Sequence, residues 1–318
     1  MGKIQAVVLG YGNRGASYSD YAVKHPDELE IVAVADPIAN RLQYAAQLHS
    51  LPEDRIFTDW RQIADQPKMA NFAIIATQDH MHLEPALAMI EKGYNLLLEK
   101  PMATTPAECK QITEAAEKKG VGIIVCHVLR FTSFWTTLKG IIDSGAIGKV
   151  MSITHMENVG NRHQSHSFVR GNWRKTSEAT PMILAKCCHD TDLIQWLIGK
   201  SCKKVQSFGS LTYFTKENKP AGAPARCTDG CPHADTCFYN AIKLYYDDKN
   251  NTWFMCCSFF RCHLCIAHDY NMITDSNLSC SSTVKTYHAT SAFSAYSIGL
   301  EAVAVFYIHN LYIFIFEY

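Results

Sequence analysis

The feature that most constrains the fold of this chain is a glycine-rich turn close to its start, within the segment KIQAVVLGYGNRG at residues 3–15. An apolar run with strand character leads into Gly10, Gly12 and Gly15, which form the pattern G-x-G-x-x-G ahead of a helical segment. In a dinucleotide-binding unit, such glycines permit a tight turn, close approach of the backbone to a pyrophosphate, and close packing of helix on strand. The pattern therefore predicts a dinucleotide site. The alternative is a doubly wound fold that holds no nucleotide.

The second predicted strand, residues 30–35, leads directly into an acidic residue, Asp36. A carboxylate at this place accepts hydrogen bonds from the ribose hydroxyls of adenosine and repels a 2′-phosphate. Arg41, in the helical segment that follows, can stack on adenine or pair with a 2′-phosphate. We therefore predict NAD as the cofactor, with NADP as the alternative.

Apolar runs and helical segments alternate through the first part of the chain. The runs at residues 71–77, 95–98 and 122–130 have the continuous hydrophobicity of parallel strands that are buried on both faces. The alternation predicts a Rossmann domain, with a doubly wound parallel sheet, over residues 1–126. Ligands bind at the carboxyl ends of such strands, so a capping or surface role is the alternative for each histidine there. The expected cofactor contacts are Gly10, Gly12, Asn13, Arg14, Gly15, Asp36, Arg41, Thr77, His80, His82, Glu99 and Lys100.

The composition bounds the class of protein and its partners. The chain has 318 residues, of which 47% are hydrophobic and 19% charged, as expected for a soluble globular protein with two domains or one large one. Thirty Lys and Arg balance thirty Asp and Glu, so the basic excess of a nucleic-acid-binding protein is missing. The first strand begins too early to leave room for a secretion signal, so we expect a cytoplasmic protein whose cysteines are thiols or metal ligands.

Several motifs follow one another in the order of a known family. They are the glycine pattern, the acidic residue after the second strand, Thr77-x-x-His80-x-His82, Glu99-Lys100-Pro101 and His189-Asp190-x-Asp192. Over about residues 1–250 the chain resembles the glucose-fructose oxidoreductase / inositol dehydrogenase (Gfo/Idh/MocA) family. The resemblance implies a Rossmann domain followed by an α/β domain with an open, mostly antiparallel sheet, which here is expected to be incomplete. It also implies that Lys100 is catalytic, although its position alone leaves a solvated lysine as the alternative.

The activity that the resemblance implies is NAD(P)-dependent hydride transfer at a secondary alcohol or ketone of a sugar, cyclitol or polyol. One alternative is a glycosidase of the same family that uses tightly held NAD. Another is a catalytically inactive or truncated nucleotide-binding protein. The expected partners are a small-molecule substrate and, through the open sheet, a second copy of the chain, with no nucleic acid and no membrane.

The second predicted domain, residues 127–250, holds the other candidate catalytic residues. A helix predicted at residues 181–199 carries Lys186, His189 and Asp190 as neighbours. Hydride removal from a secondary alcohol requires loss of the hydroxyl proton, for which an imidazole is a suitable base. By resemblance, His189 matches the catalytic histidine of the family, whereas the aspartate expected four residues earlier is replaced by Ala185. We hypothesise that Lys186 or Lys100 instead holds His189 neutral, the alternative being a core histidine.

A polar segment at residues 160–174, which we predict to be a loop, precedes that helix and contains few aliphatic residues. Its side chains offer hydrogen-bond donors for hydroxyl groups and an indole face for stacking. An exposed polar loop without a binding role is the alternative. The expected substrate contacts are Arg162, His163, Trp173, Arg174 and, on the helix, Asp190.

Cys227, Cys231 and Cys237 lie close together in a stretch that contains proline and glycine. Thiolates can hold zinc or an iron–sulfur cluster, but this spacing fits no standard zinc site. We therefore predict no metal site, with free or redox-active thiols preferred to a metal cluster at these three positions.

The composition changes abruptly in the last part of the chain, residues 251–318. This tail contains no proline and one glycine, and it ends in the β-branched and aromatic run VAVFYIHNLYIFIFEY. Three interpretations stay open: a divergent half of the sheet, a marginal membrane anchor, and a non-native translation, such as a shifted reading frame, that truncates the domain. The abruptness of the change favours the third.

Overall fold

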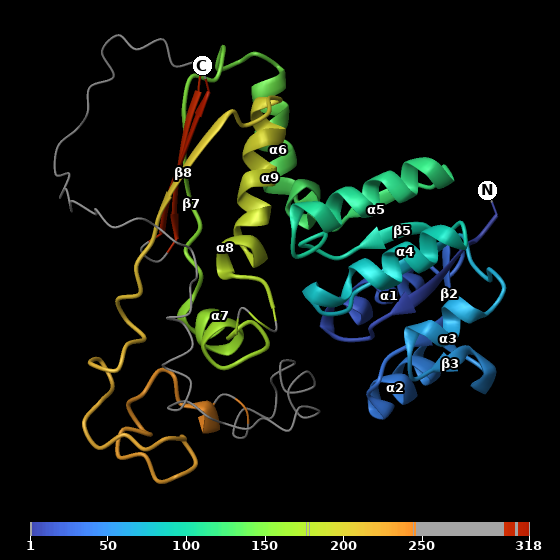
Figure 1. Ribbon diagram of the computed structural model, residues 1–318, viewed down its shortest axis with the longest axis horizontal. Helices are drawn as coiled ribbons and strands as arrows, with labels where there is room; N and C mark the ends of the chain where they lie inside the picture. Colours follow the sequence, from blue (N-terminus) through green and yellow to red (C-terminus); the bar gives the residue numbers. More distant parts are fainter. Residues whose placement is uncertain are drawn as a thin grey trace. The chain divides into compact units, whose positions relative to one another are not determined.

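The computed structural model describes residues 2–175, 177, 179–243 and 245, and the backbone of residues 302–308 and 311–317 (Figure 1). The chain divides into two compact units. The first comprises the described residues of 1–128, 176–188 and 241–263. The second comprises those of 129–175, 189–240 and 264–318.

The first unit contains a six-stranded parallel sheet in the order β3-β2-β1-β4-β5-β6. This order, which reverses direction next to β1, confirms the predicted doubly wound Rossmann sheet. The strands are β1 (Ile4–Leu9), β2 (Leu29–Ala35), β3 (Ile56–Phe57), β4 (Phe72–Ile75), β5 (Asn95–Leu98) and β6 (Ile123–Val125).

Helices flank this sheet (Figure 1): α1 (Asn13–Lys24), α2 (Ala39–His49), α3 (Trp60–Asp65), α4 (Leu83–Glu91) and α5 (Pro106–Lys119). Local signals set the ends of α5, because Thr105 and Glu108 form a capping box, Pro106 opens the first turn, and Gly120 ends the helix with φ +70°. Apolar side chains pack on both faces of the sheet in two buried clusters. The core thus fixes the strands and leaves their carboxyl ends for polar side chains.

Two strands of this sheet are shorter than the sequence predicts, β4 against residues 71–77 and, by more residues, β6. Residues 122–130 are predicted as a strand, but β6 ends at Val125 and a single 3₁₀ turn follows at Val128–Phe131. The reason is the length of its neighbour, because β6 pairs with β5, and β5 ends at Leu98, opposite Val125.

The second unit contains a four-stranded sheet in the order β7-β9-β10-β8. Its strands are β7 (Ile153–Met156), β8 (Lys204–Phe208), β9 (Ala302–Ile308) and β10 (Leu311–Glu317). Strand β10 pairs antiparallel with both neighbours, whereas β7 and β9 are parallel. Helices α6 (Ser133–Asp143) and α9 (Cys187–Ile198) lie along this sheet (Figure 1). Strands β9 and β10, which come late in the sequence, thus lie between β7 and β8.

The final residues therefore form strands, as in the first of the three interpretations of the tail. In the described part of the chain, no helix is long and apolar enough to cross a membrane. Residues 246–301 lie outside the described residues, and the interpretation as a shifted reading frame stays a prediction.

The helix predicted at residues 181–199 is interrupted. Helix α8 (Met182–Ala185) ends at Lys186, and α9 begins at Cys187. At the break, the carbonyl oxygen of Ala185 accepts a hydrogen bond from Nζ of Lys100 at 2.8 Å. A side-chain donor at a helical carbonyl competes with the regular hydrogen bond of the helix, which gives a physical reason for the interruption.

Candidate functional site

The glycine turn between β1 and α1 has the geometry that its sequence pattern requires. Gly10 has φ +90°, and a Cβ atom there would lie 2.6 Å from the carbonyl oxygen of Ala76, which follows β4. A Cβ atom at Gly15 would lie 2.0 Å from the carbonyl oxygen of Gly10. At Gly12 the nearest atom is 3.7 Å away, so its backbone stays open to a ligand. Gly10 and Gly15 thus permit the tight turn and the close packing, whereas the backbone at Gly12 stays accessible, as the pattern requires for a pyrophosphate.

Asp36 is held in place at the end of β2. Its side chain is almost fully buried, with Oδ2 accepting from the backbone N–H of Tyr11 at 2.7 Å and Oδ1 from that of Ile38 at 2.9 Å. Nη1 of Arg41 lies 3.4 Å from Oδ2. The carboxylate is therefore fixed beside the glycine turn before any ligand arrives. An Arg41 guanidinium that already pairs with Asp36 is less available for a 2′-phosphate, which favours NAD.

The turn after β5 is anchored by Glu99, which is 6% exposed. Its Oε1 accepts from the hydroxyl of Tyr18 and lies 3.5 Å from Nε of Arg14, while Oε2 accepts from the backbone N–H of Lys100 at 2.8 Å. Burial and the hydrogen bond to Glu99 raise the pKa of Tyr18. Burial also raises the pKa of the nearby Cys126 thiol to about 12. Both carboxylate oxygens of Glu99 thus serve to hold the turn that carries Lys100.

Lys100 is half-buried and directs its ammonium at the last carbonyl of α8, within the first unit. A second contact holds the same segment, because the Thr180 hydroxyl donates to the buried carboxylate of Asp79. Asp79 begins a single 3₁₀ turn, Asp79–Met81, after β4. The loops that follow β4 and β5 therefore both bind the segment around α8.

The three residues expected near the cofactor after β4 differ in exposure. Thr77 is half-buried and its hydroxyl donates to the Met81 carbonyl at 3.2 Å, whereas His80 is exposed. His82 is fully buried, with Nδ1 at 2.9 Å from the Pro101 carbonyl oxygen and Nε2 at 3.2 Å from that of Thr77. Both ring nitrogens therefore already face backbone carbonyl oxygens. The ring is buried and makes no capping hydrogen bond, so neither the capping nor the surface alternative describes it.

The second unit contains a histidine–aspartate pair that the sequence analysis did not single out. Nε2 of His155, on β7, lies 2.6 Å from Oδ1 of Asp190, on α9, and the ring of Trp135 from α6 lies 5.8 Å from that of His155. Asp190 is 1% exposed, and its Oδ2 has no hydrogen-bond partner among the described residues. Exposed and half-buried residues alternate along β7, and His155 lies on the same, less exposed side as Ile153. Because side chains alternate along a strand, this pattern in the sequence could have indicated that His155 faces inward.

His189 also lies on α9 and is 9% exposed, whereas Lys186 stands at the break between the helices. Our hypothesis that a lysine keeps His189 neutral stays a prediction. Close by in sequence, Asp192 accepts from Nε of Arg130 at 2.6 Å, so the acidic residues of this motif are both engaged within the second unit.

The segment at residues 160–174 is largely helical, in contrast to the loop that we expected. It contains α7 (Asn161–Gln164) and a π-helical turn at Ser165–Val169. The rings of His163 and Trp173 lie 6.4 and 6.3 Å from that of the buried Phe168, which explains the local order, and Nη1 of Arg174 donates to the Gly171 carbonyl at 3.1 Å. Arg162 lies on α7 itself.

Burial, together with Arg170 and Arg162, lowers the pKa of His166 in the same segment. The segment therefore presents a neutral imidazole among cationic side chains.

Cys227, Cys231 and Cys237 are half-buried free thiols. Across the residues that the structure describes, no group of three or more His, Cys, Asp or Glu side chains is arranged to hold a metal ion, these three cysteines included.

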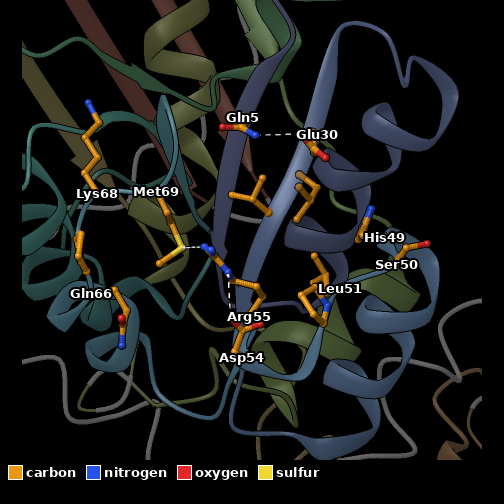
Figure 2. Close-up of a pocket in the computed structure, with 14 residues that line it drawn as sticks. Gln5, Glu30, His49, Ser50, Leu51, Asp54, Arg55, Gln66, Lys68 and Met69 are labelled. Atoms are coloured by element: carbon orange, nitrogen blue, oxygen red, sulfur yellow. Dashed lines mark hydrogen bonds and ion pairs between the residues drawn. The ribbon is translucent and has the colours of Figure 1, made fainter.

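A cavity of about 750 Å³ opens at the opposite edge of the parallel sheet (Figure 2). Gln5 and Glu30, near the starts of β1 and β2, line it and are hydrogen-bonded at 3.0 Å. The guanidinium of Arg55 points into it and lies 3.2 Å from the sulfur of Met69. The cavity is thus separate from the carboxyl ends of the strands, where the glycine turn, Asp36 and Lys100 lie.

Comparison with known proteins supports the expected relationship. The model of an oxidoreductase family with an NAD-binding Rossmann fold (GFO_IDH_MocA) matches residues 4–127, and that of the GFO/IDH/MocA C-terminal domain matches residues 135–234. Inositol 2-dehydrogenase of Salmonella typhimurium is 28% identical over 206 residues, which are 64% of this chain and 57% of that protein. The 2,7-anhydro-N-acetylneuraminate hydratase of Mediterraneibacter gnavus is 28% identical over 202 residues, covering 64% of this chain and 51% of that protein.

Among solved structures, scyllo-inositol dehydrogenase from Lactobacillus casei with bound NAD(H) and scyllo-inositol superposes with a TM-score of 0.58 at 18% identity. The match covers 66% of this chain and 60% of that one, and it shows a shared fold. The chain thus spans less than two thirds of the length of the relatives that it matches.

Proposed function

The chain belongs to the GFO/IDH/MocA oxidoreductase family, and from this membership we propose that it transfers a hydride between NAD and a secondary alcohol or ketone of a cyclitol, sugar or related polyol. The observation that carries the proposal is the placement of Lys100 at the carboxyl end of β5, in the same unit as the glycine turn and Asp36. Ligands of doubly wound sheets bind at this edge.

The residues of the first unit fit NAD. The turn at Gly10, Gly12 and Gly15 would receive the pyrophosphate, and Asp36, fixed by two backbone N–H groups, would accept hydrogen bonds from the ribose hydroxyls. When bound, the nicotinamide supplies the site that gives or takes the hydride. Glu99 is engaged with Tyr18 and Lys100, so we assign it to holding the turn and not to direct contact.

The positive charge of the Lys100 ammonium would stabilise the substrate oxygen that loses its proton. Its ammonium has three N–H donors, and the hydrogen bond to Ala185 uses one of them. The others can donate to the oxygen of the substrate and stabilise the negative charge that develops there when the hydroxyl proton leaves. His189 would accept that proton as general base. In the direction of ketone reduction, the same two groups would act in reverse.

The second unit supplies candidate contacts for further hydroxyl groups. The Asp190 carboxylate orients the ring of His155 through Nε2, and a histidine held in this way is a ready partner for a hydroxyl group. We add His155 to Arg162, His163, Trp173 and Arg174 as proposed substrate contacts, and Asp190 acts through His155.

A second candidate function is binding of the dinucleotide without catalysis. The observation that favours it is Ala185, which offers Lys100 a backbone carbonyl where the family pattern leads us to expect a carboxylate. A glycosidase is not favoured, because the relatives described above are named as a dehydrogenase and a hydratase.

The test is an assay of NAD reduction by the purified chain with myo-inositol, scyllo-inositol and a panel of sugars and other polyols. We expect turnover with at least one of them and loss of that turnover in Lys100→Met. Saturable NADH binding without turnover on any compound, in either direction, would contradict the dehydrogenase proposal and support the inactive nucleotide-binding protein.

A second copy of the chain as a partner also stays a proposal. Every residue of β8 is exposed, with Val205 at 65% and Phe208 at 51%, which supports pairing through the open sheet. Measurement of the mass in solution by light scattering tests it.

A further inference from the structure

His82 is a buried polar side chain that the proposed chemistry does not use. It is 0% exposed, at the junction between the 3₁₀ turn Asp79–Met81 and α4. Both of its ring nitrogens face backbone carbonyl oxygens, Nδ1 that of Pro101 at 2.9 Å and Nε2 that of Thr77 at 3.2 Å.

The chemistry of these contacts makes the ring a bridge. Carbonyl oxygens only accept hydrogen bonds, so the ring must be the donor in each contact. A neutral ring carries one N–H group and satisfies one of the two contacts, whereas a doubly protonated ring satisfies both. With a proton on Nδ1, the nitrogen that makes the shorter contact, the ring links the loop after β4 to the turn after β5. No apolar side chain can replace that link.

The bridge ends next to Lys100. On the N-terminal side of this lysine, the Glu99 carboxylate accepts its backbone N–H, and Tyr18 holds the same carboxylate. On the C-terminal side, the carbonyl of Pro101 is held by His82. The backbone that carries Lys100 is therefore fixed on both sides, once by a carboxylate and once by an imidazole.

We propose that His82 is a positioning residue for Lys100: its ring fixes the Pro101 carbonyl and thereby the direction in which the Lys100 ammonium points. The residue touches neither cofactor nor substrate and acts through the backbone of the turn. The catalytic part of this inference rests on the proposed function. The mechanical part, that His82 orders the turn, does not.

Three variants separate these roles. His82→Leu removes both donors, whereas His82→Gln keeps an amide with N–H donors. Tyr94→Phe is the matched control, because Tyr94 is also buried, precedes the same strand β5 at its other end, and accepts a hydrogen bond from the Met69 N–H at 2.9 Å. It removes one contact from a loop near β5 without touching the turn at Lys100.

The first measurement is amide hydrogen exchange of the peptide that covers residues 99–104 in the full chain. We expect exchange in His82→Leu to be faster by about tenfold, the loss that follows from one or two net hydrogen bonds. His82→Gln should lie in between, and Tyr94→Phe should leave this peptide unchanged. This readout needs no substrate, so it distinguishes failure of the bridge from failure of the proposed activity.

The second measurement is the split between kcat and KM on whichever substrate the panel yields. We expect His82→Leu to lower kcat by about 10-fold to 100-fold, as for a misplaced catalytic group, with nearly unchanged affinity for NADH and partial recovery in His82→Gln. Exchange and kcat in His82→Leu that match Tyr94→Phe would overturn the proposal. A loss of NADH affinity as large as the loss in kcat would also overturn it, because His82 would then be needed for cofactor binding and not specifically for the turn at Lys100. If His82→Leu does not fold, His82→Gln decides by the same two readouts.

Discussion

The described residues of the two units differ in how fully their strands are buried. In the first, residues 6–9 of β1 are all 0% exposed, and the polar side chains converge at the carboxyl ends of the strands. In the second, every residue of β8 is exposed, and Phe134, Met156 and Phe238 are each more than 60% exposed. Polar contacts join distant elements there: Arg130 to Asp192, His155 to Asp190, and Arg170 to the Tyr239 carbonyl.

The effects of mutation should therefore differ between the two units. Where an apolar core holds the strands, polar side chains at their ends are free to serve chemistry, so their loss should change activity more than stability. Where polar contacts themselves join the elements, their loss should change stability.

The largest effect is expected for Lys100→Met in the first unit. Loss of the ammonium should lower kcat by about 10²-fold to 10⁴-fold, the range for removal of an acid–base or charge-stabilising group, and leave the thermal midpoint almost unchanged. Steady-state kinetics and calorimetry measure the two quantities.

Lys68→Met is the matched control, because Nζ of Lys68 also donates to a backbone carbonyl, that of Gly93 at 2.5 Å, near the opposite end of β5. Equal losses of activity in the two variants would contradict this expectation, since the loss would then come from disturbance of β5 and not from removal of a group in the site.

Asp36→Asn should have the next largest effect, on affinity for NADH. The amide keeps one acceptor for the neighbouring backbone N–H groups but loses the charge that holds the ribose hydroxyls. We therefore expect the dissociation constant to rise by about 10-fold to 100-fold, as for a charged hydrogen bond, with a smaller change for NADPH. Fluorescence titration measures both.

Asp54→Asn, at a side chain that is 77% exposed near the other edge of the sheet, serves as the control. An unchanged NADH affinity in Asp36→Asn would remove this residue from the cofactor site.

Asp192→Asn tests the second unit. Its carboxylate is 13% exposed and pairs with both Nε and Nη2 of Arg130, so we expect a loss of about 1–2 kcal/mol in the free energy of unfolding. Asp20→Asn, in an exposed pair with Lys24 on α1, should lose about 0.5 kcal/mol or less. Urea unfolding measures both. Losses of equal size would show that polar contacts matter no more in the second unit than on the surface of the first.

The smallest expected effect is a pH dependence from His49. Burial lowers the pKa of this histidine in the folded chain, where its Nε2 is hydrogen-bonded to the Tyr11 hydroxyl at 2.7 Å. The unfolded chain therefore takes up a proton first as the pH falls below about 6.5, so stability should decrease through and below that pH. Thermal midpoints across this range should show a shallower slope in His49→Gln. A steeper slope in that variant would reverse the assigned direction.

Local patterns predicted most of the first unit. The glycines, Asp36 and the capping residues of α5 act through neighbouring backbone, so their roles follow from short stretches of sequence. The position of His82 did not follow, because its partners Thr77 and Pro101 belong to two loops that only the sheet brings together.

The second unit was harder to predict for the same physical reason. The break at Lys186 lies where Ala185 accepts a hydrogen bond from Lys100, 85 residues away in the chain. The pairing of His155 with Asp190 joins a strand to a helix, and β9 and β10 complete a sheet whose other strands lie far earlier in the sequence. The composition of that final segment differs from that of the rest of the chain, but composition does not show which strands it pairs with, because the pairing depends on the other strands of the sheet.

We propose that the first unit binds NAD at a site formed by the glycine turn and Asp36, with Lys100 beside it. Titration of the purified chain with NADH and NADPH, followed by energy transfer from tryptophan to the reduced nicotinamide, tests it most directly. We predict saturable binding of NADH, weaker binding of NADPH, and loss of that preference in Asp36→Asn. Absence of saturable binding of either dinucleotide to soluble, folded protein would contradict this proposal.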